Sequence, residues 1–166
     1  MKRIFLFVLL LFISIPVLAV DTSDWTSKST DNGYSFKVPP TWQYNEIGTS
    51  DNKGVQFTIE EPETSASVIF GYKKEPQNQV LDESYLKKFV DEIASSKNIT
   101  IEQTKSYQNG GIVVAGKDAN GFINTIAVEN TPAYLKIILF VFSDQKAVSK
   151  YSDTIHEINN TLTFPE

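Results

Sequence analysis

The sequence predicts an α+β domain: a mainly antiparallel sheet of about six to seven strands, flanked by helices on both faces. Short segments in which apolar and polar residues alternate are joined by hairpin-length turns, which is typical of antiparallel strands. Two other segments, near residues 82–98 and 144–162, repeat apolar residues at helical spacing. Residues 134–142 are apolar at almost every position, as a strand covered on both faces requires.

The N-terminal residues have the pattern of a secretory signal peptide. The basic pair Lys2-Arg3 precedes an apolar run, Ile4–Leu18, and the run ends in small residues. This pattern predicts cleavage after Ala19. An uncleaved membrane anchor is the alternative, although the run is shorter than the roughly 20 residues that a spanning helix needs.

One domain, residues 20–166, follows the predicted signal peptide, residues 1–19, and is large enough to bury a core. The formal charge of −5 becomes −7 once the +2 of Lys2 and Arg3 is removed. Because an acidic surface repels phosphate backbones, we expect no nucleic-acid partner. The chain has no cysteine, which excludes disulfides, thiol catalysis, thiolate zinc sites and a lipid-modified N-terminal cysteine.

Before residue 80 the sequence predicts short strands separated by turns. A polar leader containing Trp25 runs into a first strand, and the turn signal Asp31-Asn32-Gly33 follows it. The next strands are predicted at 34–38, 43–46, 55–59 and 65–72, with a turn at 50–54. In the last of them Val68 and Phe70 share one face, whereas Ile69 and Tyr72 fall outside that alternation.

Two helices are predicted on either side of a second group of strands. Asp82 or Ser84 can cap the first helix, which we expect to end near residues 97–98, and Ser143 or Asp144 can cap the second. Between the helices the predicted strands are 99–107, 112–115, 122–128 and 134–142, with turns at 109–111 and 119–121. The fully apolar strand 134–142 is predicted to be the central strand of the sheet.

Several short motifs occur along the domain in a recognisable order. They are Tyr34-Ser35-Phe36-Lys37-Val38-Pro39-Pro40-Thr41-Trp42, Val68-Ile69-Phe70, Ser84-Tyr85-Leu86-Lys87-Lys88-Phe89-Val90, Gly110-Gly111-Ile112-Val113-Val114-Ala115-Gly116, Tyr151 and residues 158–164. This layout resembles the PsbP-like superfamily, which includes the extrinsic photosystem II subunit, Mog-type Ran-binding proteins and small exported prokaryotic proteins. The resemblance implies an antiparallel sheet flanked by helices and a binding or assembly module without catalysis. Since partners differ between members, it implies no particular binding residue.

His156 is the only histidine and lies in the predicted C-terminal helix, off its apolar stripe. We interpret it as a solvated helix residue. The alternative is a general base or a metal ligand, but no Gly-x-Ser-x-Gly motif is present to supply a nucleophile.

Two groups of carboxylates are candidates for binding a hard cation. They are Glu60-Glu61 with Glu63, and Asp82-Glu83. Neither has the alternate spacing and glycine of a calcium loop, so we interpret them as solvated loop and helix-capping residues.

The remaining candidates have ordinary structural interpretations. Gly110-Gly111 and Gly116 lack the Gly-Lys-Ser/Thr of a phosphate loop and are read as turn and strand glycines. Asn98 and Asn159 begin glycosylation sequons, which matter only in a host with that machinery. Four aromatic residues either line a ligand groove or, more often for such residues, belong to the core or its rim: Trp25, Trp42, Tyr44 and Tyr72.

Taken together, these features predict an exported, non-catalytic binding or assembly module of the extracellular space, periplasm or cell surface. We expect a protein or envelope component as its partner, no catalytic residue, cofactor or metal, and membrane contact only through the signal segment if that is kept. A small cell-envelope hydrolase or a cation-binding protein is the alternative, and a purely structural component is a third.

Overall fold

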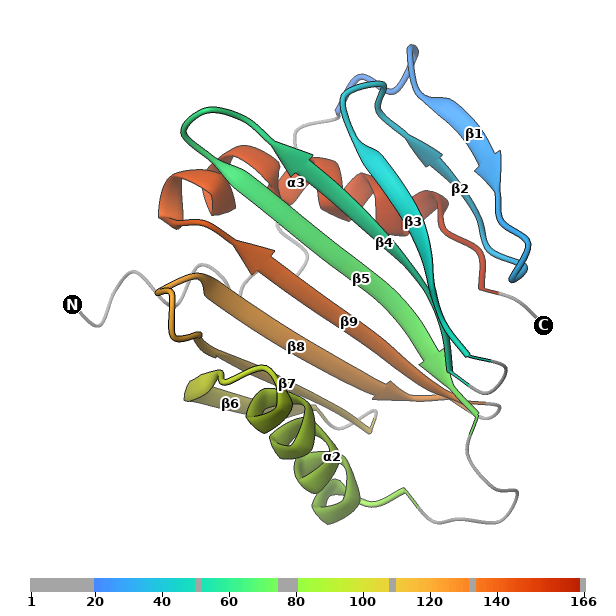
Figure 1. Cartoon of the computed structure of the whole chain (residues 1–166). Helices are drawn as coiled ribbons and strands as arrows, with labels where there is room; N and C mark the ends of the chain where they lie inside the picture. Colours follow the sequence, from blue (N-terminus) through green and yellow to red (C-terminus); the bar gives the residue numbers. More distant parts are fainter. Residues whose placement is uncertain (1–19, 50–51, 75–80, 108–109, 132–133, 165–166) are drawn as a thin grey trace.

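The structure is a computed structural model that describes residues 20–49, 52–74, 81–107, 110–131 and 134–164 (Figure 1). The predicted signal peptide lies outside these residues, as do parts of the turns predicted at 50–54 and 109–111. No helix within the described ranges is long and apolar enough to cross a membrane.

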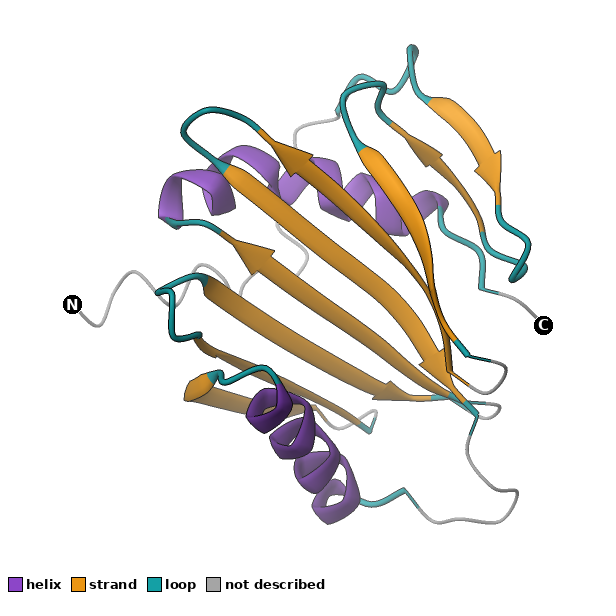
Figure 2. Ribbon diagram, in the orientation of Figure 1, coloured by secondary structure: helices purple, strands orange, loops and turns teal. Residues whose placement is uncertain are grey.

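The described chain forms nine strands and two helices. In order they are β1 (Thr26–Ser29), β2 (Ser35–Val38), β3 (Gln43–Gly48), β4 (Asn52–Glu60), β5 (Ser65–Lys73), α2 (Glu83–Ser96), β6 (Thr100–Tyr107), β7 (Gly111–Lys117), β8 (Ile123–Asn130), β9 (Leu135–Phe142) and α3 (Gln145–Thr161). Seven strands form one antiparallel sheet in the order β3-β4-β5-β9-β8-β7-β6, and β1 and β2 form a separate hairpin (Figure 2). The predicted α+β class is confirmed.

The sheet consists of two runs of hairpins, β3 to β5 and β6 to β9, that join where β5 pairs with β9. In this register Ile138 of β9 lies between Phe70 of β5 and Ala127 of β8. The strand β9 is therefore the middle strand of seven, as its apolar sequence predicts.

Both helices begin at an aspartate whose side chain accepts a hydrogen bond from the backbone. The Oδ1 atom of Asp82 accepts from the amide of Tyr85 at 2.8 Å, and that of Asp144 accepts from the amide of Ala147 at 2.8 Å. These bonds satisfy donors that the first turn of a helix leaves unpaired. Asp82 and Asp144, rather than the neighbouring serines, are thus the caps.

The two helices cover opposite faces of the sheet, and each buries one hydrophobic cluster. The α3 face of the sheet carries Phe57, Phe70 and Phe140, which cluster with residues of α3 and of the β1–β2 hairpin. The α2 face carries Ile126 and Leu139, which cluster with α2. Helices on both faces agree with the layers that the sequence predicts.

Tyr72 differs from its expected position. It lies on the α3 face with Val68 and Phe70, buried beside Tyr34, whose ring centroid is 6.2 Å away. Residues 68, 70 and 72 keep the two-residue period of a strand, so Tyr72 continues the alternation. Only Ile69 points to the opposite face.

Candidate functional site: an apolar cleft beside helix α3

Each helix covers one half of the sheet, and the two helices lie on opposite faces and over opposite halves. Helix α2 packs on β6, β7 and β8, whereas α3 packs on β2, β5 and β9 on the other face (Figure 1). Two quarters of the sheet therefore have no described helix packed against them: the α2 face of β3 to β5, and the α3 face of β7 and β8.

The first of these quarters is mainly polar, although Ile47 of β3 and Ile69 of β5 also lie on this face. On the α2 face, β3, β4 and β5 present Asn45, Gln56, Thr58 and Ser67. The Gln56 Nε2 atom donates to Ser67 Oγ at 2.9 Å. A polar face of this kind is normal for an antiparallel sheet with one side in water.

The second quarter is apolar and is built from small side chains. On the α3 face, β7 presents Gly111, Val113 and Ala115, and the facing residues of β8 include Thr125 and Ala127. Small residues on a sheet leave space that larger ones would fill. Gly111, Val113 and Ala127 line a cleft between α3 and β6, whereas Ala115 and Thr125 are buried beyond it.

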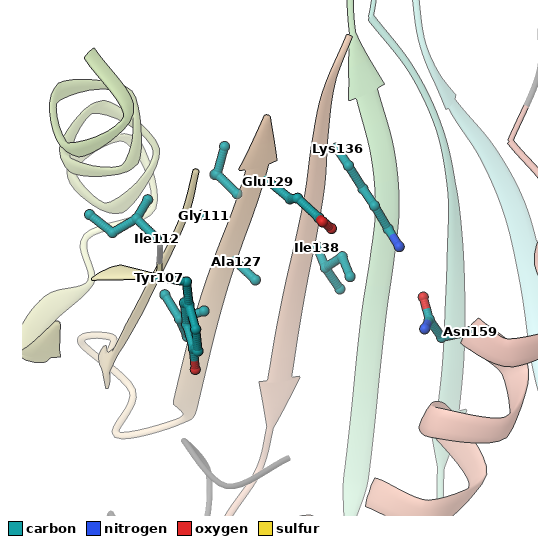
Figure 3. A pocket seen from close by; sticks show the side chains of 10 residues that line it. Tyr107, Gly111, Ile112, Ala127, Glu129, Lys136, Ile138 and Asn159 are labelled. Atoms are coloured by element: carbon teal, nitrogen blue, oxygen red, sulfur yellow. The ribbon is translucent and has the colours of Figure 1, made fainter. Parts of the chain in front are cut away.

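The cleft has a volume of about 280 Å³ (Figure 3). Its apolar floor is formed by Val113, Ala127 and Ile138. Its polar rim consists of Tyr107 on β6, Glu129 on β8, Lys136 on β9 and Asn159 on α3. The side chains at the rim thus come from four different elements.

Three polar atoms on this side of the sheet make no hydrogen bond within the described structure. They are Tyr107 Oη, Asn159 Oδ1 and Thr125 Oγ1, and all three are buried. A buried polar group without a partner costs about 1–3 kcal/mol. Tyr107 and Asn159 line the cleft itself, so a bound molecule would be able to supply their missing partners.

Lys136 is the cation of the cleft. Its Nζ atom lies 5.0 Å from the ring centroid of Phe164, which the pairing of Thr163 with Ser35 holds in place. Burial lowers the pKa of the Lys136 ammonium, and the charge of Glu129 opposes that shift. The lysine is therefore partly desolvated, as a group prepared to meet a ligand would be.

His156 lies on α3 and is half-buried. Ser152, His156 and Asn159 follow one another at helical spacing and occupy one flank of α3. Because Asn159 lines the cleft, this flank borders it. His156 itself does not line the cleft, and its half-buried position on α3 leaves its interpretation as a solvated helix residue open.

The carboxylates that were candidates for cation binding have partners within the fold. Glu61 pairs with Lys150 and Glu63 with Lys146, both on α3. Glu83 accepts a hydrogen bond from Ser106 Oγ at 2.6 Å, and Asp82 caps α2. Across the described ranges, no group of three His, Cys, Asp or Glu side chains is placed to hold a metal ion.

The candidate aromatic residues belong to the core and not to a groove. Trp42 and Tyr72 are buried, and Trp25 and Tyr44 are half-buried against the same cluster. Asn98 has a left-handed backbone with φ of 54° just after α2, a conformation that asparagine tolerates well.

The candidate glycines are turn and strand residues, as predicted. Gly110 has a φ of 83° in the turn before β7. Gly116 lies in β7, where a Cβ atom would overlap the carbonyl of Thr100 on β6.

The residues that line the cleft were not identified from the sequence. Tyr107, Lys136 and Asn159 are far apart along the chain and form no linear motif. The one available signal is the run of small alternate residues on two neighbouring strands, ending at Ala115 and Ala127.

No protein-family model and no curated protein matches this sequence. Among solved structures, cyanobacterial PsbP from Synechocystis is similar, with 12% identity, 92% of this chain and 98% of that chain covered, and a TM-score of 0.53. LpqN of Mycobacterium tuberculosis, involved in cell envelope biogenesis, aligns at 12% identity over 86% of this chain and 91% of its own, with a TM-score of 0.46. The similarity to cyanobacterial PsbP shows that this chain has the PsbP-like fold, which confirms the fold that the sequence resemblance implies.

Proposed function

We propose that this protein is an exported, non-catalytic binding module of the PsbP-like type that engages a partner protein or an envelope component at the cleft. The observation that carries the proposal is the contrast between the two quarters of the sheet without a helix. The quarter over β4 and β5 is mainly polar, with Gln56, Thr58 and Ser67 on its surface and Ile69 packed towards the α2 cluster. The quarter over β7 and β8 is apolar, and apolar concavities with a few polar groups are typical of binding sites.

The chemistry of the rim supports binding better than catalysis. Tyr107, Asn159, Lys136 and Glu129 are groups that orient a ligand through hydrogen bonds and charge. A hydrolase would instead need a nucleophile held against a base. His156, on the flank of α3 that borders the cleft, is the base that such an enzyme would use. A hydrolytic activity that His156→Ala removes would favour the hydrolase alternative.

Export is supported by the basic N-terminus and the apolar run that follows it. Expression in a bacterial host with its secretion machinery, followed by mass spectrometry of the protein, tests this part. We expect a mature chain that begins at Val20. A chain that still begins at Met1 and sediments with membranes would contradict it.

Partner capture by paired variants tests the binding role. The mature chain is immobilised and exposed to an envelope extract from its host, as wild type, Ala127→Trp and Thr58→Trp. The first substitution fills the cleft, and the second adds the same side chain on the polar α2 face of β4. We expect capture to be lost in Ala127→Trp and kept in Thr58→Trp, with circular dichroism confirming that both variants fold. Equal capture by all three proteins would contradict a role for the cleft.

A further inference from the structure

Two opposite charges stand side by side at the rim of the cleft. Lys136 and Glu129 are directly opposed across β9 and β8, and Figure 3 shows their side chains extending from these neighbouring strands. Opposed residues have Cβ atoms roughly 4.5–5.5 Å apart. Neither residue forms an ion pair within the described ranges, although Lys136 Nζ lies over the Phe164 ring and the charge of Glu129 acts on Lys136.

The other rim residues add hydrogen-bonding groups around this pair. Asn159 Oδ1, which has no hydrogen-bond partner, is an acceptor on the α3 side of the cleft. In Figure 3 the Asn159 side chain lies on the same side as the Lys136 ammonium. Tyr107 stands opposite Gly111 in the register of β6 and β7 and bounds the far side. A ligand at this rim would meet a cation, an anion and a neutral acceptor together.

The floor and the volume limit what the ligand can be. Val113, Ala127 and Ile138 offer only apolar side-chain atoms next to the charged pair. A volume of about 280 Å³ lies just below the usual range for drug-sized ligands, roughly 300–1,000 Å³. A small ligand that contacts both the charged pair and the floor needs a charged group and a short apolar group.

We propose that the cleft binds a single free amino acid with an apolar side chain. Its carboxylate pairs with Lys136, its ammonium pairs with Glu129, and its side chain lies on the floor. This inference rests on the proposed function, since it takes the cleft as the binding site. A fatty acid would use only the cation, and an alkyl amine only the anion, whereas a zwitterion uses both.

Calorimetric titration of the mature protein with three matched molecules tests the proposal. Phenylalanine carries both charges, 3-phenylpropionate lacks the ammonium, and phenethylamine lacks the carboxylate. Since a hydrogen bond to a charged group contributes about 1.5–3 kcal/mol, we expect phenylalanine to bind at least about tenfold more tightly than either analogue. Analogues that bind as tightly as phenylalanine, or no binding by any of the three, would overturn the proposal.

Two substitutions test which residue of the rim binds which charged group of the ligand. In Lys136→Met the preference for phenylalanine over phenethylamine should disappear, because the carboxylate has lost its partner. In Glu129→Gln the preference over 3-phenylpropionate should disappear. Lys88→Met is the control, since Lys88 is exposed on α2 and pairs with Glu92, and it should bind like the wild type. Preferences that survive both cleft substitutions would show that the zwitterion binds elsewhere.

The results of the capture and titration experiments distinguish failure of this inference from failure of the proposed function. If Ala127→Trp abolishes partner capture but phenylalanine does not bind the wild type, the cleft is a binding site for another kind of molecule and only this inference fails. If Ala127→Trp changes neither capture nor phenylalanine binding, both fail. Partner capture and phenylalanine binding that Ala127→Trp abolishes and Thr58→Trp preserves would together support both.

Discussion

The two runs of strands in the sheet share their hairpin construction but differ in the size of the side chains on the α3 face. In β4 and β5 these are large, with Phe57 and Phe70 in edge-to-face contact at 5.9 Å. In β7 and β8 they are small, with Ala115 facing Thr125 and Val113 facing Ala127. The first run packs against α3 and the β1–β2 hairpin, and the second forms the floor of a cleft. On the α3 face, side-chain volume therefore distinguishes the core over β4 and β5 from the cleft over β7 and β8.

Buried hydroxyl groups show the same difference. In the first run Thr64 Oγ1 shares a hydrogen bond of 2.8 Å with Tyr151 Oη of α3. In the second run Thr125 Oγ1 is buried and has no partner. An unsatisfied buried group lowers stability, and such losses are common where a surface serves a ligand. The comparison therefore predicts that substitutions in the first run mostly destabilise the fold, whereas some substitutions in the second run stabilise it.

Phe57→Ala should cause the largest effect. Phe57 is fully buried, and its ring also contacts Phe36 with centroids 4.7 Å apart. The substitution leaves a cavity that β4 cannot close, so the free energy of unfolding should fall by about 3–5 kcal/mol. Urea denaturation measures this loss. Val113→Ala, in the floor of the cleft, should cost clearly less, and equal losses would show that the two halves are packed alike.

Gly116→Ala should have the next largest effect. It should act in the second run of strands, at the pairing of β6 with β7. Its Cβ atom would overlap the carbonyl of Thr100, a backbone atom of the edge strand β6. Forcing extra volume into a packed site costs about 1–3 kcal/mol, and β6 should separate from β7. Hydrogen exchange at the β6 amides and thermal unfolding measure the effect. Gly71→Ala is the control, because its Cβ would lie 3.4 Å from the carbonyl oxygen of Lys53, an ordinary contact.

The local elements could be predicted because their signals are local. The alternation of Val55, Phe57 and Ile59 defines β4, and the stripe that begins at Val148 and Tyr151 defines α3. The apolar strand β9 could even be placed at the centre of the sheet, since a strand that is apolar on both faces must be covered on both. These features depend on neighbours in sequence, where the periodicity of a strand or helix applies directly.

The cleft could not be predicted because it depends on contacts between distant segments. The pairing of β5 with β9 brings together residues almost seventy positions apart, such as Phe70 and Ile138. Only that pairing decides that α3 stops short of β8. In the sequence, Lys136 is a single charged residue within an apolar strand and resembles an ordinary surface residue. Only the register of β8 and β9 shows that it lies opposite Glu129.

A matched pair of threonine substitutions sharpens the comparison between the two halves. Thr125→Val removes a buried hydroxyl that has no partner, so the protein should become more stable by about 1 kcal/mol. Thr64→Val leaves Tyr151 Oη without its buried partner and should lower stability by a similar amount, about 1 kcal/mol. The two residues are similarly buried, at 1% and 4% exposure. Chemical denaturation of both variants measures the difference, and losses of equal size would contradict the unsatisfied state of Thr125.

The smallest expected effect is a pH-dependent contribution of Lys136. Burial lowers the pKa of its ammonium in the folded protein, and the charge of Glu129 offsets part of the shift. In the unfolded chain the pKa returns to its ordinary value of 10.5. Between these two values the unfolded chain binds more protons than the folded one, so stability rises with pH there. The effect is small because the ammonium remains partly in contact with water.

Lys136→Met isolates that contribution. The substitution keeps an apolar stem but removes the charge, so the variant should be slightly more stable than the wild type at neutral pH. The difference in stability between the variant and the wild type should shrink as the pH rises towards 10.5. Near that pH the Lys136 ammonium of the wild type loses its proton in both the folded and the unfolded state. Urea denaturation of both proteins across this range measures the difference, and other titrating groups cancel because both proteins share them. If the difference in stability between the variant and the wild type stayed constant or grew with pH, burial of Lys136 would not disfavour its charge. The rim of the cleft would then be as well solvated as the polar residues of β3 to β5.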